Sequence, residues 1–206
     1  YTIASVTVTP ADITPAPLTI TATDQTKVYG TVAALGNGAF TVSGLVGTDT
    51  VSSVTLTSVG SPAAATVSGS PYAIVPSAAQ GTGLGNYTIN YVNGQLAVTP
   101  APLTIKAGDQ HKAYGTVGAL GTAAFTVTGL LNADTVTDVT LSSPTGSPAA
   151  ATVAGSPYAI TPSGANGNGL SNYTISYVDG ALTVDPTPLM ITATDQTKPY
   201  GTALNL

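Results

Sequence analysis

Apolar and polar residues alternate along most of this chain, which is the two-residue period of half-buried β-strands. Leu18–Thr23, Ala39–Ser43 and Val54–Thr57 follow this pattern. Pro71–Pro76 resembles a short strand with a proline at each end, which predicts an edge strand. Gly44–Val51 is rich in turn residues and has room for one short helical turn. The pattern therefore predicts an all-β protein with very little helix.

A β-hairpin is predicted near the end of this pattern. Tyr87–Val92 and Gln95–Thr99 flank Asn93-Gly94, a dipeptide that favours the type I′ turn of two-residue hairpins. The same arrangement recurs later in the chain around Asp179-Gly180, the other favoured dipeptide.

The whole pattern occurs twice. Pro17–Pro100 aligns with Pro102–Pro186, with one inserted residue after Ser143 and about two-thirds identical positions. Tyr-Gly recurs at Tyr29, Tyr114 and Tyr200, and so long a period indicates an array of small domains. We predict four parts: 1–15, the last strands of a preceding repeat; 16–100 and 101–186, two β domains; and 187–206, the first strand of a following repeat.

The expected fold of each domain is a small antiparallel β-sandwich of immunoglobulin-like type, with a β-grasp-like domain as the alternative. Successive domains are joined by Pro-x-Pro segments such as Pro100-Ala101-Pro102. Such joints are short and semi-rigid. Strands of eight to ten residues make a domain roughly 30–40 Å long, so two domains should form a rod of roughly 70–80 Å.

Composition narrows the function. The chain has 206 residues, a net charge of −5, and only 6% charged residues, with no Glu, Arg, Trp or Cys. Without a basic patch, nucleic-acid binding is not expected. The absence of cysteine rules out disulfides and thiolate chemistry. No apolar run approaches the ~20 residues of a membrane span.

Recurring acids are the first candidate site, namely Asp24, Asp109 and Asp195, and Asp49 and Asp134. They could bind calcium between domains, but calcium needs six to eight oxygens, usually from clustered carboxylates. Because these acids are isolated in the sequence, we expect turn or capping roles and no metal.

Recurring lysines and asparagines are the second candidate, namely Lys27, Lys112 and Lys198 with Asn86 and Asn172. A Lys–Asn cross-link with a nearby Asp is one possibility, and we favour ordinary solvated lysines. Asn86 and Asn172 also match the Asn-x-Thr glycosylation pattern, for which we expect no sugar. His111 replaces a threonine of the other copies, so we expect an exposed, non-catalytic histidine.

Recurring tyrosines are the third candidate: Tyr29, Tyr72, Tyr87 and Tyr91, with their counterparts Tyr114, Tyr158, Tyr173 and Tyr177. A tyrosine stripe can bind carbohydrate by stacking. Phe40 and Phe125 are the only aromatic side chains besides the tyrosines, so we expect the tyrosine rings to be needed for core packing. We predict no catalytic, cofactor-binding or metal-binding residues, and no enzyme.

Four motifs resemble the MBG repeats (YGX type) of very large bacterial surface adhesins. They are Pro-Leu-Thr-Ile-x-Ala-x-Asp-Gln-x-Lys-x-Tyr-Gly, Gly-Leu-x-x-x-Asp-Thr-Val, Pro-Tyr-Ala-Ile-x-Pro-Ser, and a closing Asn-Tyr-Thr-Ile-x-Tyr-Val-(Asn/Asp)-Gly-x-Leu-x-Val. The first residues, through Pro15, are similar to the end of a YDG-type repeat. The resemblance implies an extracellular stalk, often in filamentous-haemagglutinin-like proteins exported by two-partner secretion, and it implies no enzymatic residues.

We therefore expect stalk or spacer repeats of an extracellular bacterial adhesin, which project an adhesive region from the cell surface. The alternatives are repeats that bind a glycan or matrix polymer with avidity from repetition, or that self-associate into a surface filament. The expected partners are neighbouring repeats, and no cofactor is expected.

Overall fold

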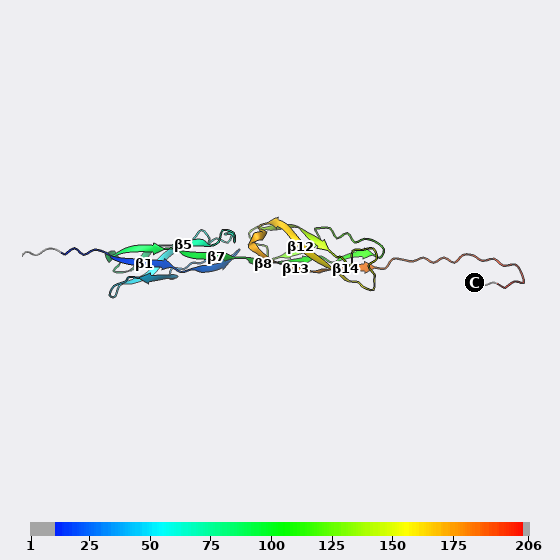
Figure 1. Cartoon of the computed structure of the whole chain (residues 1–206), viewed down its shortest axis with the longest axis horizontal. Coiled ribbons are helices and arrows are strands. Elements are labelled where there is room, and N and C mark those ends of the chain that lie inside the picture. The colour runs from blue at the N-terminus through cyan, green and yellow to red at the C-terminus, as the bar shows by residue number, and fades with distance from the viewer. Residues whose placement is uncertain (1–10, 204–206) are drawn as a thin grey trace, which may run out of the picture. The chain divides into compact units, whose positions relative to one another are not determined.

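The computed structural model describes residues 11–203 (Figure 1). Contacts between Cα atoms divide them into two compact units. The first unit holds the described residues up to Ile105, with Val127–Asp138 and Ala165–Ser176. The second holds Lys106–Thr126, Val139–Gly164 and the described residues from Tyr177 onward. Most of the expected end of a preceding repeat, residues 1–10, lies outside the described residues, and the four-part division of the chain stays a prediction.

Each repeat consists of seven strands and one 3-10 turn, which confirms the all-β class. The first repeat contains β1 (Ala16–Ala22), β2 (Gln25–Val28), β3 (Phe40–Ser43), β4 (Thr50–Thr57), β5 (Tyr72–Thr82), η1 (Leu84–Asn86), β6 (Tyr87–Val92) and β7 (Gly94–Thr99). The second contains β8 (Ala101–Ala107), β9 (Gln110–Ala113), β10 (Phe125–Thr128), β11 (Thr135–Ser142), β12 (Tyr158–Asn168), η2 (Leu170–Asn172), β13 (Tyr173–Val178) and β14 (Gly180–Asp185).

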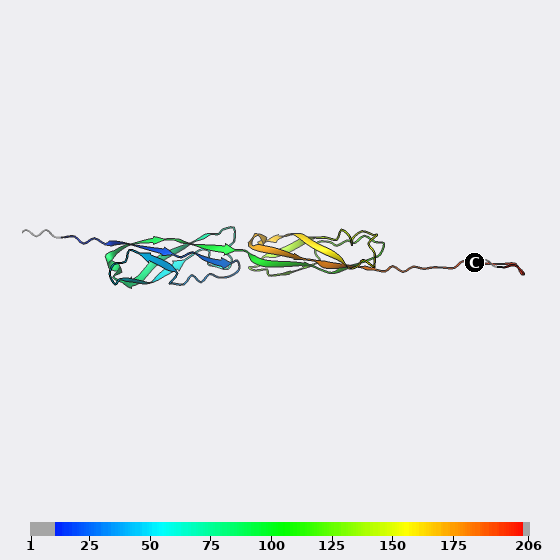
Figure 2. The ribbon, with the colours of Figure 1, turned by 60° about the horizontal axis from the view of Figure 1, so that its bottom comes forward.

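Two sheets form in each repeat (Figure 2). In the first repeat the strand orders are β3-β1-β6 and β2-β7-β5-β4, and the second repeat has the same orders in its own strands. Alternate residues of β1 point into the core, where Leu18 and Ile20 are fully buried with Val54 and Tyr87. Each such aliphatic side chain contributes about 1.5–3 kcal/mol through burial.

The predicted hairpin is wrong. β6 and β7 belong to different sheets, and neither Asn93 nor Gly94 has the positive φ that a type I′ turn needs. Instead the chain passes at Asn93-Gly94 from one sheet to the other, beside the crossing from β1 to β2. Glycine is needed there because a Cβ on Gly94 would overlap the carbonyl of Ala22. The dipeptide serves a close backbone approach, not a turn.

The first and last strands of the repeat run parallel, a departure from the antiparallel pairing expected. β1 pairs with β6 from Ala16↔Tyr87 to Thr21↔Val92, and β2 pairs with β7 from Gln25↔Leu96 to Val28↔Thr99. The register is the same on both sides of the crossing, so two long strands lie side by side through the repeat.

Two further local predictions are wrong. Tyr72–Thr82 forms one long central strand, since β5 lies between β7 and β4. Pro76 is tolerated because the pairing with β7 ends at Ile74, so the side of the strand without an N–H faces no partner there. The helical turn also lies elsewhere: it is η1, directly before Tyr87, and not within Gly44–Val51.

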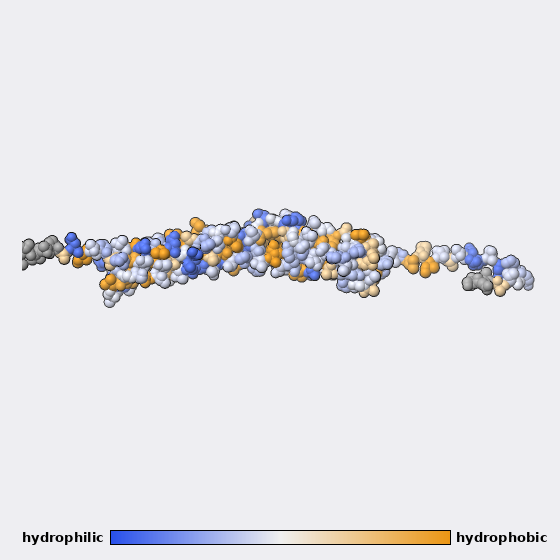
Figure 3. Space-filling model, viewed as in Figure 1, coloured by the Kyte–Doolittle hydropathy of each residue, from blue (hydrophilic) through white to orange (hydrophobic). Residues whose placement is uncertain are grey.

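Residues 187–203 contain no strand and are exposed (Figure 1). Leu189, Met190 and Ile191 are each more than 80% exposed, and this segment carries hydrophobic surface in Figure 3. β1 has a closely similar sequence, with Thr19 where this segment has Met190, but β1 is held by β3 and β6, which have no counterparts among residues 187–203. No helix within residues 11–203 is both long and apolar enough to span a membrane.

Candidate functional site

The most developed polar arrangement joins the first repeat to segments of the second, inside the first compact unit. It begins with a turn at Val28–Thr31, in which Thr31 N donates to Val28 O at 3.2 Å and Gly30 has a φ of 85°. A positive φ at the third turn position favours glycine. The same hydrogen bond closes Ala113–Thr116 and the exposed Pro199–Thr202, so the local Tyr-Gly-Thr sequence is sufficient for the turn.

Tyr29 leaves this turn and is only 3% exposed. Its hydroxyl donates to Asp134 Oδ2 at 2.9 Å, and its ring meets that of Tyr173 edge-on, with centroids 5.5 Å apart at 79°. Such aromatic pairs contribute about 0.5–1.5 kcal/mol beyond their buried area. Gly30 lies against Leu131 so closely that a Cβ at this position would overlap the leucine side chain. We call Tyr29, Gly30, Leu131, Asp134 and Tyr173 the joint.

The acceptor side of the joint is built by Tyr173. Its hydroxyl accepts from Leu131 N at 2.8 Å and donates to Asp134 Oδ2 at 2.7 Å. The Asp134 N–H also closes a turn onto Leu131 O at 2.9 Å. A Cβ on Gly169 would overlap the Asp134 carboxylate, so glycine is required where the carboxylate lies. Contacts within the second repeat therefore position the Asp134 carboxylate without any contribution from Tyr29.

Two hydrogen bonds flank the joint. Asn132 Nδ2 donates to Ala63 O at 3.1 Å, and Val67 N donates to Asn172 Oδ1 at 2.9 Å. Asn172 is 3% exposed and its amide also donates to Gly169 O at 3.1 Å. Both flanking bonds involve the loop before β5 in the first repeat. That loop and the Tyr-Gly turn therefore contact the same segments of the second repeat.

Burial and the carboxylate both raise the tyrosine pKa values. Burial is the larger cause for Tyr173, whose hydrogen bond to Asp134 adds to it, and its pKa is raised to about 12. Burial also raises the pKa of Tyr29. Because the raised pKa values keep both phenols protonated at neutral pH, both can donate to the Asp134 carboxylate.

Two of the other recurring acids, Asp24 and Asp109, accept hydrogen bonds from backbone N–H groups. Asp24 Oδ1 accepts from Gln95 N at 2.7 Å, and Asp109 Oδ1 accepts from Ala181 N at 2.9 Å. Each carboxylate thus caps the strand that follows the crossing between sheets, which is the capping role expected from the sequence. Within residues 11–203, no three His or Asp side chains gather where they could hold a metal ion. Asp195 lies in the exposed segment after residue 186.

The lysines were expected to be solvated, and two of them are buried. Lys27 and Lys112 are each 7% exposed. Lys27 Nζ donates to the carbonyls of Thr31, Ser61 and Pro62, and Lys112 has the matching three partners in its own repeat. Burial lowers the pKa of Lys27. The lysine sits at an inward position of β2, and carbonyl oxygens take the place of water around its ammonium group.

The remaining candidates are spread over the surface and core. His111 is exposed, as expected, with Nδ1 3.3 Å from Asp185 Oδ2. The cross-link pairing of lysine and asparagine has no support in the contacts, because Asn172 is bonded to Val67 and Gly169. Its counterpart Asn86 is exposed.

Core packing of the tyrosines is confirmed for Tyr87 and Tyr173, which are 9% and 8% exposed. Tyr29 is buried too, but in the joint. Tyr91 and Tyr177 are 36% and 40% exposed at matching positions, and the Tyr91 hydroxyl accepts from Ala79 N at 2.9 Å.

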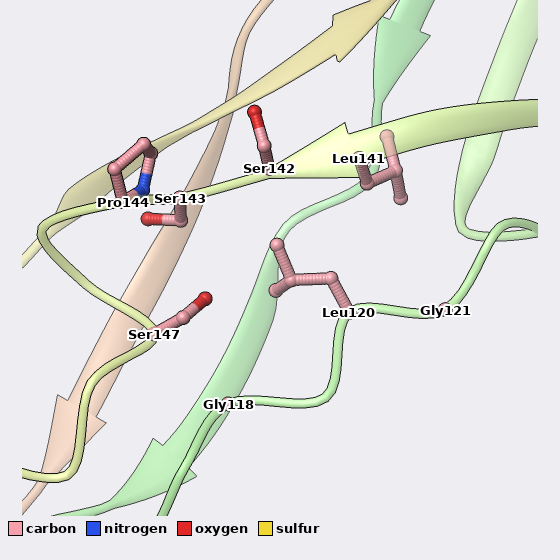
Figure 4. Close-up of a pocket in the computed structure, with 8 residues that line it drawn as sticks. All are labelled: Gly118, Leu120, Gly121, Leu141, Ser142, Ser143, Pro144 and Ser147. Atoms are coloured by element: carbon pink, nitrogen blue, oxygen red, sulfur yellow. The ribbon is translucent and has the colours of Figure 1, made fainter.

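A shallow hollow of about 310 Å³ lies in the second unit (Figure 4). Leu120, Ser142 and Ser147 line it, with the buried Ser143, whose hydroxyl has no hydrogen-bond partner among the described residues. The hollow is open to solvent and has no charged or aromatic side chain in its lining. It offers neither a base nor a stacking surface.

Sequence reasoning missed the joint. The available signal was the recurrence of Tyr29-Gly30 in every copy together with Asp134 and Tyr173. The turn accounts for the glycine but not for the two tyrosines or the aspartate. Those motifs were assigned to core packing and turns because the residues that meet are about a hundred positions apart.

The chain is thus an all-β tandem repeat protein whose consecutive repeats share a buried polar joint. The sequence profile of the MBG domain (YGX type) matches residues 18–97 and 103–183, so the chain belongs to this family. This confirms the resemblance drawn from the motifs. MBG domains are structural repeats typical of surface adhesin-like proteins. No curated protein and no solved structure matches the chain.

Proposed function

We propose that these repeats are a load-bearing stalk or spacer of an extracellular bacterial adhesin, which holds an adhesive region away from the cell surface. Family membership supports the surface location. The observation that carries the mechanical role is the parallel pairing of the first and last strands of a repeat, β1 with β6 and β2 with β7.

Parallel pairing decides how a repeat bears tension. The chain enters the repeat at the start of β1 and leaves it at the end of β7. Tension along the chain therefore pulls two adjacent strands in opposite directions along their common axis. The ladder bonds lie across the strands, so they are loaded together and not one after another. The Asp24–Gln95 bond and the closely packed Gly94 hold the ladder where it crosses between sheets.

The joint supports the same role. A spacer made of repeats needs neighbours that resist independent movement, and the short Pro100-Ala101-Pro102 segment and the Tyr29–Asp134 bond both restrict it. Repetition of such units adds length, and none of the contacts requires a substrate or a cofactor.

Single-molecule pulling tests this proposal. The chain has no cysteine, so two introduced cysteines give unique attachment points. Attachment at Thr14→Cys and Ala101→Cys loads β1 against β6 and β2 against β7 along the strands. Attachment at Thr14→Cys and Ser43→Cys starts where β1 and β3 pair antiparallel, Thr19↔Ser43, and separates their bonds one at a time.

We expect the first geometry to need a clearly higher unfolding force than the second at the same pulling rate. Because Ala101 is 1% exposed, the alternative attachment Thr99→Cys serves if that variant folds poorly. Equal forces in the two geometries would contradict a load-bearing role.

Glycan binding is the second candidate, and Tyr91 and Tyr177 are the observation that favours it. They present partly exposed rings at equivalent positions of both repeats. Each position offers a single ring, so binding would be weak per repeat and would depend on avidity. Glycan-array binding that is lost in the double Tyr91→Ala, Tyr177→Ala variant would support it over the stalk.

A further inference from the structure

We propose that the Tyr114-Gly115 turn is a docking surface for one partner, an MBG repeat that follows in the same polypeptide. That repeat would supply an aspartate and a tyrosine equivalent to Asp134 and Tyr173. The inference concerns the recognition between repeats and holds whether or not the array bears load.

The first step is the contrast between two copies of one motif. Tyr29 and Tyr114 sit in the same hydrogen-bonded turn, yet Tyr29 is 3% exposed and Tyr114 is 48% exposed. Gly30 and Gly115 have φ values of 85° and 87°. A Cβ on Gly30 would overlap Leu131, while one on Gly115 would meet nothing within 4 Å. The turn at 113–116 is thus preformed and uncovered.

The acceptor side is also preformed in the first repeat. In the first repeat, Tyr87 OH donates to Asp49 Oδ2 at 2.8 Å and accepts from Val46 N at 2.8 Å. These bonds match those of Tyr173, Asp134 and Leu131 in the joint. Within residues 11–203, Tyr87 provides the only tyrosine hydroxyl that is hydrogen-bonded to Asp49. Each repeat therefore presents a tyrosine on one turn and a carboxylate–phenol pair on another, and these two surfaces are complementary.

The occupant follows from continuity with the existing joint. After the second repeat, Pro186-Thr187-Pro188 takes the place of Pro100-Ala101-Pro102, and the opening motif recurs through Tyr200-Gly201. Thr187 Oγ1 donates to Tyr114 O at 2.7 Å, which holds the connecting segment next to the turn. A covalently linked repeat arrives at high effective concentration, so a small joint suffices.

The test completes a third repeat. The present chain is compared with an extended chain in which residues 116–186 of its own second repeat are joined after Gly201. Both are nitrated with tetranitromethane, and the rate at each tyrosine is followed by peptide mass spectrometry. In the present chain Tyr114 should react and Tyr29 should be protected. In the extended chain the Tyr114 rate should fall about tenfold or more, in line with the exposed fractions of the two tyrosines.

Two controls make the result specific. Replacing only the copied equivalent of Asp134 by Asn or by Ala should restore Tyr114 reactivity, and protected core amides will show that the added repeat is still folded. Unchanged Tyr114 reactivity in a folded extended chain would overturn the proposal. Tyr114 protection that grows with concentration of the present chain would also overturn it, since the partner would then be a second copy.

Discussion

Removal of the Tyr29 hydroxyl should lower the stability of the chain, whereas removal of the equivalent Tyr114 hydroxyl should have little effect. Tyr29→Phe keeps the ring and its edge-on contact with Tyr173 but deletes the bond to Asp134 Oδ2. Tyr114→Phe deletes the equivalent hydroxyl from a half-exposed side chain. The two variants therefore differ in the joint and share almost everything else.

The magnitude follows from the contacts. A hydrogen bond to a charged group contributes about 1.5–3 kcal/mol. Asp134 is half-buried and keeps its bond from Tyr173, so we expect the lower part of this range, about 1.5–2 kcal/mol for Tyr29→Phe. For a chain of this size such a loss lowers the Tm by roughly 3–8 °C. Tyr114→Phe should stay within about 0.5 kcal/mol.

Urea unfolding at neutral pH, with thermal melts beside it, measures both variants against the parent. The midpoint should fall for Tyr29→Phe at an unchanged m-value, which indicates a change in stability and not in the surface exposed on unfolding. Equal midpoints for the two variants, whether both match the parent or both fall below it, would refute the assignment of Asp134 as the partner of Tyr29.

Three further outcomes are expected. Gly30→Ala should cost about 1–3 kcal/mol more than Gly115→Ala in urea unfolding, because both strain a positive φ but only the first overlaps a neighbour; equal losses would contradict this. Lys27→Met should lower stability by about 2–4 kcal/mol, since it leaves three partly buried carbonyls without their ammonium donor. Lys106→Met, on the exposed face of β8, should lie within about 0.5 kcal/mol of the parent. Stability should fall as the pH rises from about 10 to about 12. In this window the tyrosines of the unfolded chain lose their protons, while folded Tyr173, with its pKa of about 12, keeps its proton. Urea midpoints that stay constant across this window would contradict the burial of the phenols.

Features that depend on a few adjacent residues could be predicted from the sequence. The alternation in Leu18–Ala22 predicted β1. The Tyr-Gly-Thr turn forms even at Pro199–Thr202, where the surrounding residues are exposed. In each case the decisive interactions are the steric limits on φ and ψ or a bond to nearby chain, and these are encoded locally.

The pairing of strands was decided by the tertiary structure. Asn93-Gly94 has the local signature of a hairpin, yet each flanking strand finds its partner about seventy residues away, because parallel pairing with β1 and β2 buries Leu18, Ile20 and Leu96. Pro76 likewise predicted an edge strand. β5 can be central and still contain this proline because its pairing with β7 ends at Ile74.

The joint depended on tertiary structure most of all. The sequence by itself determined the repeat, the strand alternation and the family. It placed Tyr29 in a core and Lys27 in solvent, because a strand pattern tells which residues are inward but not what lies opposite them. The environment of Tyr29 comes from Asp134 and Tyr173 of the next repeat, and that of Lys27 comes from loop carbonyls that only the folded chain brings together.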